Sequence, residues 1–152
     1  MWYSFKESYV YYTEITDFPE NTFGFIYRIT HIPSKRYYIG KKFLYHNVKK
    51  KLTKKEIAEQ TGPGRKSLTK TIQKESDWKS YWGSSKEFLE LVKKYPEEEF
   101  KKEIIYIVTN KKLLTYYEVK AQLENNCLQD SLCYVDNVLG KFYKKDFTNL
   151  DS

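Results

Sequence analysis

The sequence is poor in the features that define secreted and membrane proteins. It contains two cysteines, Cys127 and Cys133, together with six glycines and four prolines. Small secreted domains use more cysteines for a disulfide framework, so we expect two ordinary buried thiols. The sequence has no apolar run long enough to span a bilayer, and residues 1–7 lack the basic start and apolar stretch of a secretory signal. These absences predict a cytoplasmic location and no membrane partner.

Charge is abundant and unevenly distributed. The chain has 27 basic and 20 acidic residues, a net charge of +7. Residues 35–79 hold fourteen Lys or Arg and four acids, a local net of +10, so the remaining residues sum to −3. A basic block beside a mildly acidic remainder indicates either a face that binds a polyanion or a solvated lysine-rich surface.

Aromatic and β-branched residues predict three strands. Thr22–Thr30 and Arg36–Leu44 are close enough in sequence to pair as a hairpin across the turn at 31–35. The continuous apolar run within Phe100–Thr109 is typical of a strand buried on both faces. The acidic and aromatic residues 1–21 are expected to form an extended arm with one short strand.

Three helices are predicted between and after these strands. Leu52–Gln60 has a capping-box start, with Thr53 followed three residues later by Glu56. A second helix is expected over residues 86–94, and the clearest one over residues 111–125. Residues 65–75 fit a helix or a loop, and the stretch from Cys127 onward reads as irregular.

Two tyrosine-bearing segments stand at a characteristic spacing on the predicted hairpin. Phe-Ile-Tyr ends at Tyr27, and Tyr-Ile-Gly begins at Tyr38 after ten intervening residues. With this pair the sequence resembles the GIY-YIG nuclease superfamily, although its first half reads Phe-Ile-Tyr with Gly24 one place early. The segments Thr-Gly-Pro-Gly-Arg-Lys (61–66) and Ser-Asp-Trp-Lys-Ser-Tyr-Trp-Gly-Ser-Ser (76–85) look like phage-encoded members. The resemblance covers roughly residues 22–145.

The resemblance implies both a fold and a function. The fold is α/β (α+β), with a small central antiparallel sheet of about three strands flanked by helices. One nuclease domain would span residues 1–152, with an N-terminal arm over 1–21 and a basic, DNA-contacting insertion over 45–82. The implied activity is hydrolysis of double-stranded DNA with one divalent ion, Mg²⁺ or Mn²⁺, in a phage or homing-type endonuclease acting in the host cytoplasm. Tyr27 would serve as general base, and Tyr38 would orient the water or the phosphate.

Glu118 is the candidate metal ligand. It lies on or beside the apolar stripe that Leu114, Tyr117 and Ala121 form on the predicted 111–125 helix. Burying a lone carboxylate is costly unless it is paired or binds a metal. The resemblance assigns a helix glutamate at this place to the metal. The alternatives are Glu124, further along the same helix, and a Glu118 that merely pairs with a neighbouring lysine.

The cation that stabilises the reacting phosphate is less clearly marked. The family usually supplies an arginine from the helix after Tyr-Ile-Gly, and no arginine stands within a couple of turns of Gly40. Arg65 is the best candidate among the three arginines, and Lys41 or Lys42 could share the role. His46 suits proton transfer near neutral pH, or is a surface histidine at a strand end. By resemblance, Asn137 corresponds to a late asparagine near the site. The lysines expected to hold the DNA backbone are Lys41, Lys42, Lys49, Lys50, Lys51, Lys66 and Lys70.

Two other kinds of function fit parts of the sequence. Residues 52–75 echo the first helix and turn of a helix-turn-helix, which would make the chain a non-catalytic DNA-binding protein. The missing family arginine also fits a protein that kept the fold as a structural or interaction module and lost the activity. Cutting of plasmid DNA that depends on a divalent ion separates the nuclease from both alternatives.

Overall fold

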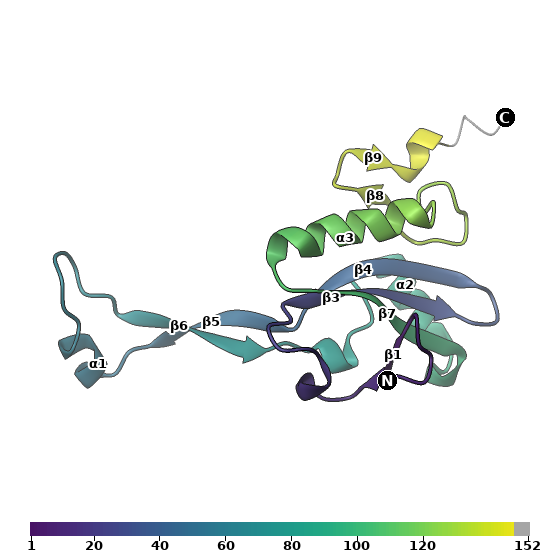
Figure 1. The fold of residues 1–152 in the computed structure, drawn as a ribbon. Coiled ribbons are helices and arrows are strands. Elements are labelled where there is room, and N and C mark those ends of the chain that lie inside the picture. Colours follow the sequence, from purple (N-terminus) through teal and green to yellow (C-terminus); the bar gives the residue numbers. More distant parts are fainter. Residues whose placement is uncertain (148–152) are drawn as a thin grey trace. The chain divides into compact units, whose positions relative to one another are not determined.

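The computed structural model describes residues 1–147, and they divide into two compact units. The first, here the main unit, consists of residues 1–44 and those from 77 onward. The second, the ribbon unit, is Tyr45–Ser76 (Figure 1). No helix within residues 1–147 is long and apolar enough to cross a membrane.

The main unit is built on a five-stranded sheet in the order β2-β1-β7-β3-β4. The strands are β1 (Trp2–Ser4), β2 (Tyr11–Tyr12), β3 (Gly24–His31), β4 (Arg36–Phe43) and β7 (Phe100–Val108). The hairpin of β3 and β4 and the buried strand β7 confirm three predicted strands. These three strands are antiparallel neighbours, as expected, but the sheet has five strands rather than about three and is mixed, because β1 pairs parallel to β7 and β2 pairs with β1. The N-terminal segment is thus part of the sheet, since Trp2 is buried there.

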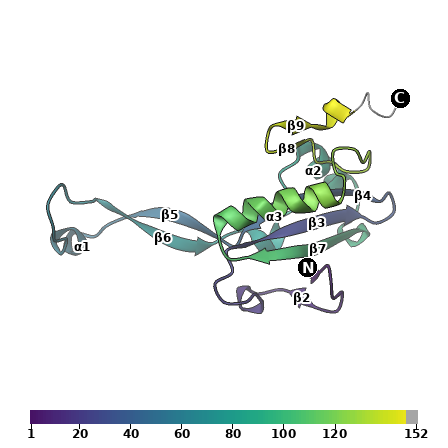
Figure 2. The ribbon, with the colours of Figure 1, turned by 45° about the horizontal axis from the view of Figure 1, so that its top comes forward.

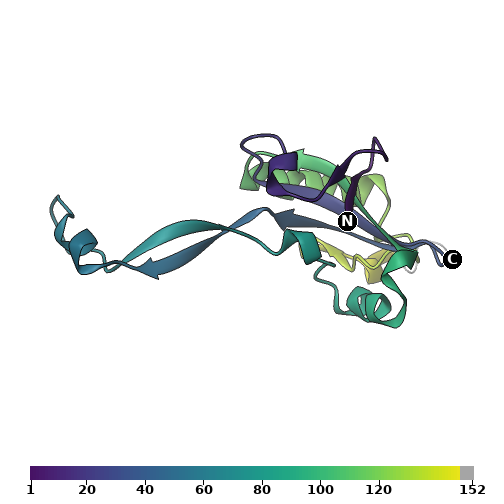
Figure 3. The same ribbon diagram turned by 90° about the horizontal axis from the view of Figure 1, so that it is seen from below.

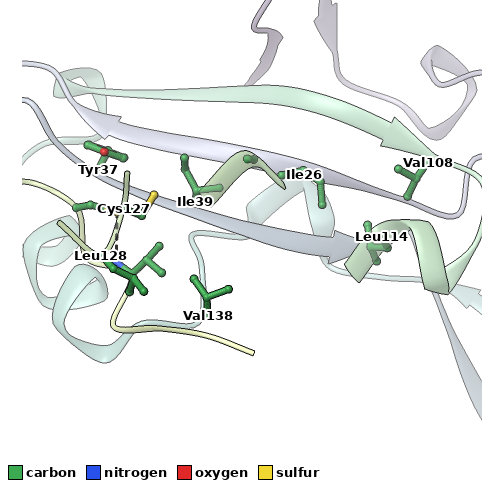
Figure 4. Packing of buried hydrophobic residues seen from close by; sticks show 11 residues of the cluster. Ile26, Tyr37, Ile39, Val108, Leu114, Cys127, Leu128 and Val138 are labelled. Carbon is green, nitrogen blue, oxygen red and sulfur yellow. Dashed lines mark hydrogen bonds between the residues drawn. The ribbon is translucent and has the colours of Figure 1, made fainter. Parts of the chain in front are cut away.

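Helix α3 (Lys111–Glu124) covers one face of this sheet and confirms the predicted long helix. It starts at Asn110, whose side chain accepts a hydrogen bond from the Leu113 N–H at 2.9 Å, as expected of an N-cap. Figure 2 shows α3 running along β3. Apolar side chains of α3 and of β3, β4 and β7 form the core beneath it, together with residues after the helix (Figure 4). Members of this core include Ile26, Ile39, Val108, Leu114, Ala121, Cys127, Leu128 and Val138.

The other face of the sheet carries a mostly aromatic core. Alternation along β3 and β4 sends Phe25, Tyr27 and Tyr38 to this face. Helix α2 (Lys86–Lys94) packs here through Phe88, whose ring centre lies 5.9 Å from that of Tyr38. Figure 3, a view from below, shows the N-terminal segment and α2. Helix α2 confirms the predicted second helix, and the Ser85 side chain caps it by accepting a hydrogen bond from the Phe88 N–H.

Short elements complete the main unit. They are β8 (Asn137–Val138), β9 (Phe142–Tyr143) and the 3-10 helices Ile15–Asp17, Trp78–Ser80, Glu97–Glu99 and Lys144–Phe147. Cys127 and Cys133 are free and buried, as expected. The residues after 147 lie outside the described part of the chain.

The ribbon unit is an antiparallel pair of strands joined by a helical connection. Its elements are β5 (Tyr45–Lys51), α1 (Lys54–Ala58) and β6 (Thr69–Glu75). The predicted capping box forms at the start of α1, where Thr53 and Glu56 exchange hydrogen bonds. The helix-turn-helix alternative is wrong, because a single helix of five residues precedes a strand over residues 69–75. Residues 77–82, placed by sequence in the basic insertion, lie in the main unit.

Candidate active site

Tyr27 lies at the centre of the aromatic core and reaches toward the edge of the sheet. Tyr27 is 1% exposed, and it lies opposite Gly40 where β3 pairs with β4. A β-carbon on Gly40 would stand 2.6 Å from the Tyr27 hydroxyl oxygen. A second glycine, Gly83, has its β-carbon position 3.5 Å from the same oxygen. Two glycines therefore leave the space that this hydroxyl occupies.

Tyr38 stands beside Tyr27 on the edge strand β4. The two ring centres are 6.2 Å apart, and the Tyr38 hydroxyl shares a hydrogen bond of 3.1 Å with the Ser84 hydroxyl. Because β4 is the last strand of the sheet, Tyr38 borders open space beyond the strand as well as the aromatic core.

Glu118 approaches the same edge from the opposite face. It comes from α3, which packs on the face that carries Ile39, whereas the two tyrosines belong to the aromatic face. Helix α3 is fixed against β4 at this point, since the Gln122 side chain donates to the Ile39 carbonyl at 3.1 Å. One turn earlier, the Glu118 carboxylate lies 4.0 Å from the Lys41 ammonium.

A cavity of about 400 Å³ brings these groups together around the edge of the sheet. Its wall includes Tyr38, Lys41, Ser84, Glu118, Gln122 and Asn137. Tyr27 is not part of that wall but lies next to it, in contact with Tyr38. Four of the sequence-predicted residues, Tyr38, Lys41, Glu118 and Asn137, thus share one cavity, although they come from β4, α3 and β8.

Burial makes the titrating groups of this site harder to charge. It raises the pKa of the Tyr27 phenol well above the ordinary value, and the neighbouring Tyr81 and Tyr38 raise it further. Burial likewise raises the pKa of Tyr38, against a hydrogen bond from Ser84 that lowers it. The pKa of the Glu118 carboxyl is raised by burial and partly lowered by the charge and backbone of Lys41. The negative charge of Glu118 also contributes to raising the pKa of both tyrosines, so the three groups lie within electrostatic reach.

Lys41 is the cation that the main unit places at the cavity. Its ammonium donates to the Thr115 hydroxyl at 3.2 Å and faces Glu118. Lys42 points to the aromatic face instead, where it pairs with Asp77 and lies 3.9 Å from the ring centre of Tyr81. It does not line the cavity.

The guanidinium groups of the two arginines of the main unit lie near tyrosine rings. The guanidinium carbon of Arg28 lies 4.0 Å from the ring centre of Tyr37, and its nitrogen donates to the Asn125 side chain at 3.2 Å. The guanidinium carbon of Arg36 lies 6.0 Å from the ring centre of Tyr134. Neither guanidinium lines the cavity that holds Glu118.

The remaining predicted residues lie in the ribbon unit. His46 and Lys49, Lys50 and Lys51 are on β5, Arg65 and Lys66 are in the connection, and Lys70 is on β6. Arg65 and His46 are exposed, and their roles in catalysis stay predictions. Lys70 forms an ion pair with Glu56 at 2.6 Å. The rival metal ligand Glu124 accepts a hydrogen bond from the Tyr106 hydroxyl at 2.9 Å and does not line the cavity.

Sequence reasoning did not single out three groups that the structure places at the site. They are Tyr81, whose ring centre is 5.8 Å from that of Tyr27, and Ser84 and Gln122. Tyr81 and Ser84 belong to the Ser76–Ser85 stretch, which carried part of the resemblance, so a signal for them was present. Gln122 follows Glu118 by one helical turn, and that spacing alone could have suggested a shared face.

The donor set at the cavity fits a hydrated divalent ion held by one carboxylate. Within residues 1–147 no group of three or more His, Cys, Asp or Glu side chains is placed to hold a metal. Mg²⁺ does not need such a cage, because it keeps several waters and is commonly bound through one or two carboxylates and the phosphates of its substrate. Glu118 is a half-buried carboxylate with a raised pKa beside an open cavity, and a cation there would favour its charged form.

The fold and this cluster of two tyrosines and a glutamate at a sheet edge agree with a comparison to protein families. The family model described as "Putative endonuclease segE, GIY-YIG domain" matches residues 2–145. The chain therefore belongs to the GIY-YIG endonuclease superfamily, and within it the segE-type domain is the one matched. No curated protein and no solved structure matches the chain.

Proposed function

We propose that the chain is a DNA endonuclease that hydrolyses phosphodiester bonds with one divalent ion, Mg²⁺ or Mn²⁺. In this proposal Tyr27 is the general base, Tyr38 orients the attacking water or the phosphate, and Glu118 is the metal ligand. Lys41 supplies fixed positive charge. Double-stranded DNA is the substrate, and the basic residues of the ribbon unit hold its backbone.

The observation that carries the proposal is the convergence at the edge of β4. Tyr38 and Glu118 line one cavity, and Tyr27 lies next to it, behind Tyr38, with its hydroxyl beside Gly40. A cavity of about 400 Å³ open to solvent is large enough for a phosphate group with its water. A purely structural role would not require a half-buried phenol and a carboxylate to face the same open space, with a second, buried phenol directly behind them.

The resting state of Tyr27 follows from its surroundings. Since its pKa is raised well above the ordinary value of about 10, the phenol is protonated at neutral pH. To act as base it first releases that proton to solvent. A divalent ion bound at Glu118 would add positive charge that stabilises the reacting phosphate oxygens.

Hydrolysis then proceeds by proton transfer and attack of water on phosphorus. The Tyr27 phenolate takes a proton from water, and the water oxygen forms a bond to phosphorus. The bond from phosphorus to one deoxyribose oxygen breaks, and that oxygen takes a proton from solvent. One water is consumed, and the strand ends in a phosphate and a hydroxyl. Tyr38 contributes by holding the water or a phosphate oxygen through its hydroxyl, which Ser84 orients.

The test is the nicking of supercoiled plasmid. We expect cutting with Mg²⁺ or Mn²⁺ and none in excess chelator. Tyr27→Phe removes only the base oxygen, and Glu118→Gln removes only the carboxylate charge, so each should lower the cutting rate by about 10²-fold or more while duplex binding is kept. Matched controls are Tyr116→Phe and Glu124→Gln, on exposed positions of the same helix α3.

Three results of this experiment would contradict the proposal. Undiminished cutting in chelator would exclude the metal, and full activity of Tyr27→Phe or Glu118→Gln would exclude the assigned roles. A protein that binds duplex equally well in chelator and never cuts would instead be a DNA-binding protein.

A further inference from the structure

The two strands of the ribbon unit present chemically different faces. Successive side chains of a strand point to opposite sides, and the register pairs Asn47 with Gln73, Lys49 with Thr71, and Lys51 with Thr69. These six polar side chains therefore share one face, here called the polar face. The opposite face carries His46, Val48, Lys50, Lys70, Ile72 and Lys74.

The polar face has no structural task within the chain. All six of its residues are exposed, and within the described residues none of their side chains makes a hydrogen bond or an ion pair. By contrast, the opposite face has the apolar pair of Val48 and Ile72 and the ion pair of Lys70 with Glu56. The donors and acceptors of the polar face are thus open to an external partner.

The ribbon unit as a whole is built for a polyanion. Residues 45–76 contain nine Lys or Arg and three Glu, a net charge of +6 out of +7 for the whole chain. None of its side chains is buried, so it has no hydrophobic core of its own. An isolated two-stranded hairpin is only marginally stable in water. A bound partner with a regular array of negative charge would stabilise it.

Its dimensions match the major groove of duplex DNA. That groove is wide enough to admit a two-stranded ribbon. Residues 45–51 of β5 span about 20 Å at about 3.4 Å per residue, close to six base-pair steps of B-DNA. Figure 1 shows that β5 and β6 of this ribbon twist around each other.

The side chains of the polar face are those that read base edges. Amides such as Asn47 and Gln73 can pair with both major-groove atoms of adenine, lysine can contact guanine, and a threonine methyl can contact the methyl group of thymine. We propose that the polar face enters the major groove and selects the DNA sequence, while cations such as Lys50 and Lys74 contact phosphates. The inference rests on the proposed function in taking duplex DNA as the substrate.

The test is a binding selection with the whole chain in chelator, from a pool of duplexes with randomised sequence. We expect the unaltered chain to select a preferred sequence. In Asn47→Ala/Gln73→Ala the preference at one or more positions should vanish, because each well-made amide contact discriminates bases by about 5- to 100-fold. Lys50→Ala/Lys74→Ala, the matched pair on the opposite face, should keep the preferred sequence but bind all duplexes more weakly, with a shallower salt dependence.

Circular dichroism and thermal melting should show that both double variants remain folded. This is expected because all four positions are exposed. An unchanged preferred sequence in Asn47→Ala/Gln73→Ala overturns the inference. So does the absence of any preference in the unaltered chain, or stronger binding to single-stranded oligonucleotides than to duplex.

Binding in chelator separates this inference from the nuclease proposal. If the chain selects a sequence through the polar face but never nicks plasmid, only the catalytic proposal fails. If it nicks plasmid and the polar-face variant cuts the same sites with the same preference, only the reading of bases by the ribbon fails.

Discussion

The hydroxyl oxygen of Tyr27 lies 2.6 Å from the place where a β-carbon of Gly40 would stand. The two residues are register partners on adjacent strands, so neither can move away without disturbing the hairpin. The glycine of the Tyr-Ile-Gly segment is therefore a spatial requirement of the upstream tyrosine, and the two halves of the motif depend on each other.

Substitution of Gly40 should inactivate the site, although Gly40 has no side chain that could take part in the reaction. In Gly40→Ala the added methyl meets the Tyr27 oxygen and ring, so the phenol must shift. A displacement of about 1 Å is enough to lower the plasmid-cutting rate by about 10²-fold. Binding to duplex should be unaffected.

A second variant shows whether the phenol is the cause. Adding Tyr27→Phe to Gly40→Ala removes the nearest atom in the clash, so the double variant should melt at a higher temperature than Gly40→Ala alone, while remaining inactive. Equal melting temperatures for the two would argue against contact between these residues.

Acid should weaken metal binding at an unusually high pH. The Glu118 carboxyl must lose its proton to hold a cation, and burial raises its pKa above the ordinary value. The affinity for Mn²⁺, measured by electron paramagnetic resonance, should therefore begin to fall as pH decreases while an exposed glutamate would still be fully charged. Glu118→Gln should show weak binding at every pH, and Glu124→Gln should follow the unaltered chain. A midpoint at or below the ordinary glutamate pKa would contradict this.

Lys102 should make stability rise with pH. Its ammonium is held 4.3 Å from the ring centre of Trp2 and 4.6 Å from that of Trp82, and burial lowers its pKa to about 8. Between pH 8 and its ordinary value of about 10.5, the unfolded chain binds this proton more strongly than the folded chain. The free energy of unfolding should therefore increase over this pH range. The unfavourable contribution of Lys102 to stability should be greatest below pH 8.

Lys102→Met is the matching variant, since it keeps the length of the side chain without the charge. It should unfold at higher urea concentration near pH 7, and its stability should rise less between pH 8 and 9.5 than that of the unaltered chain. Parallel pH curves for the two proteins would exclude Lys102 as the source.

The packing of α3 should be sensitive at Leu114 and tolerant at Leu113. Leu114 is fully buried against the sheet beside Gly24, whereas Leu113 is 38% exposed. Leu114→Ala leaves a cavity and should lower the free energy of unfolding by about 2–5 kcal/mol, measured by urea denaturation. Leu113→Ala should change it by about 1 kcal/mol or less. Similar losses at both positions would contradict the observed orientation of the helix.

Sequence patterns predicted the strands and helices whose local sequence signal matches their environment in the fold. Strands β3, β4 and β7 are rich in aromatic and β-branched residues, and α3 has a capping asparagine and an apolar stripe. The N-terminal strand β1 was underestimated because three residues carry no periodicity, and its pairing with β7 depends on contacts about a hundred positions away. Strand β6 was missed because both its faces are exposed and polar, so that only its pairing with β5 defines it.

The candidate site, like the fold, could be predicted from the sequence only in part. The spacing of Tyr27 and Tyr38 and the position of Glu118 on an apolar stripe were visible in the sequence. The meeting of Tyr38 with Glu118 was not, because the two residues come from opposite faces of the sheet and share a cavity only around its edge strand. The role of Lys41 also depends on how α3 lies against β4, which no local pattern specifies.

The pairing of Trp2 with Lys102 has a consequence for synthesis of the chain. After β1 has been synthesised, about a hundred further residues must be translated before its partner strand β7 emerges from the ribosome. Glu118 emerges later still. Under the proposed roles of Tyr27, Tyr38 and Glu118, the site is incomplete during that interval. The proposed cutting activity would therefore begin only after most of the polypeptide has been translated.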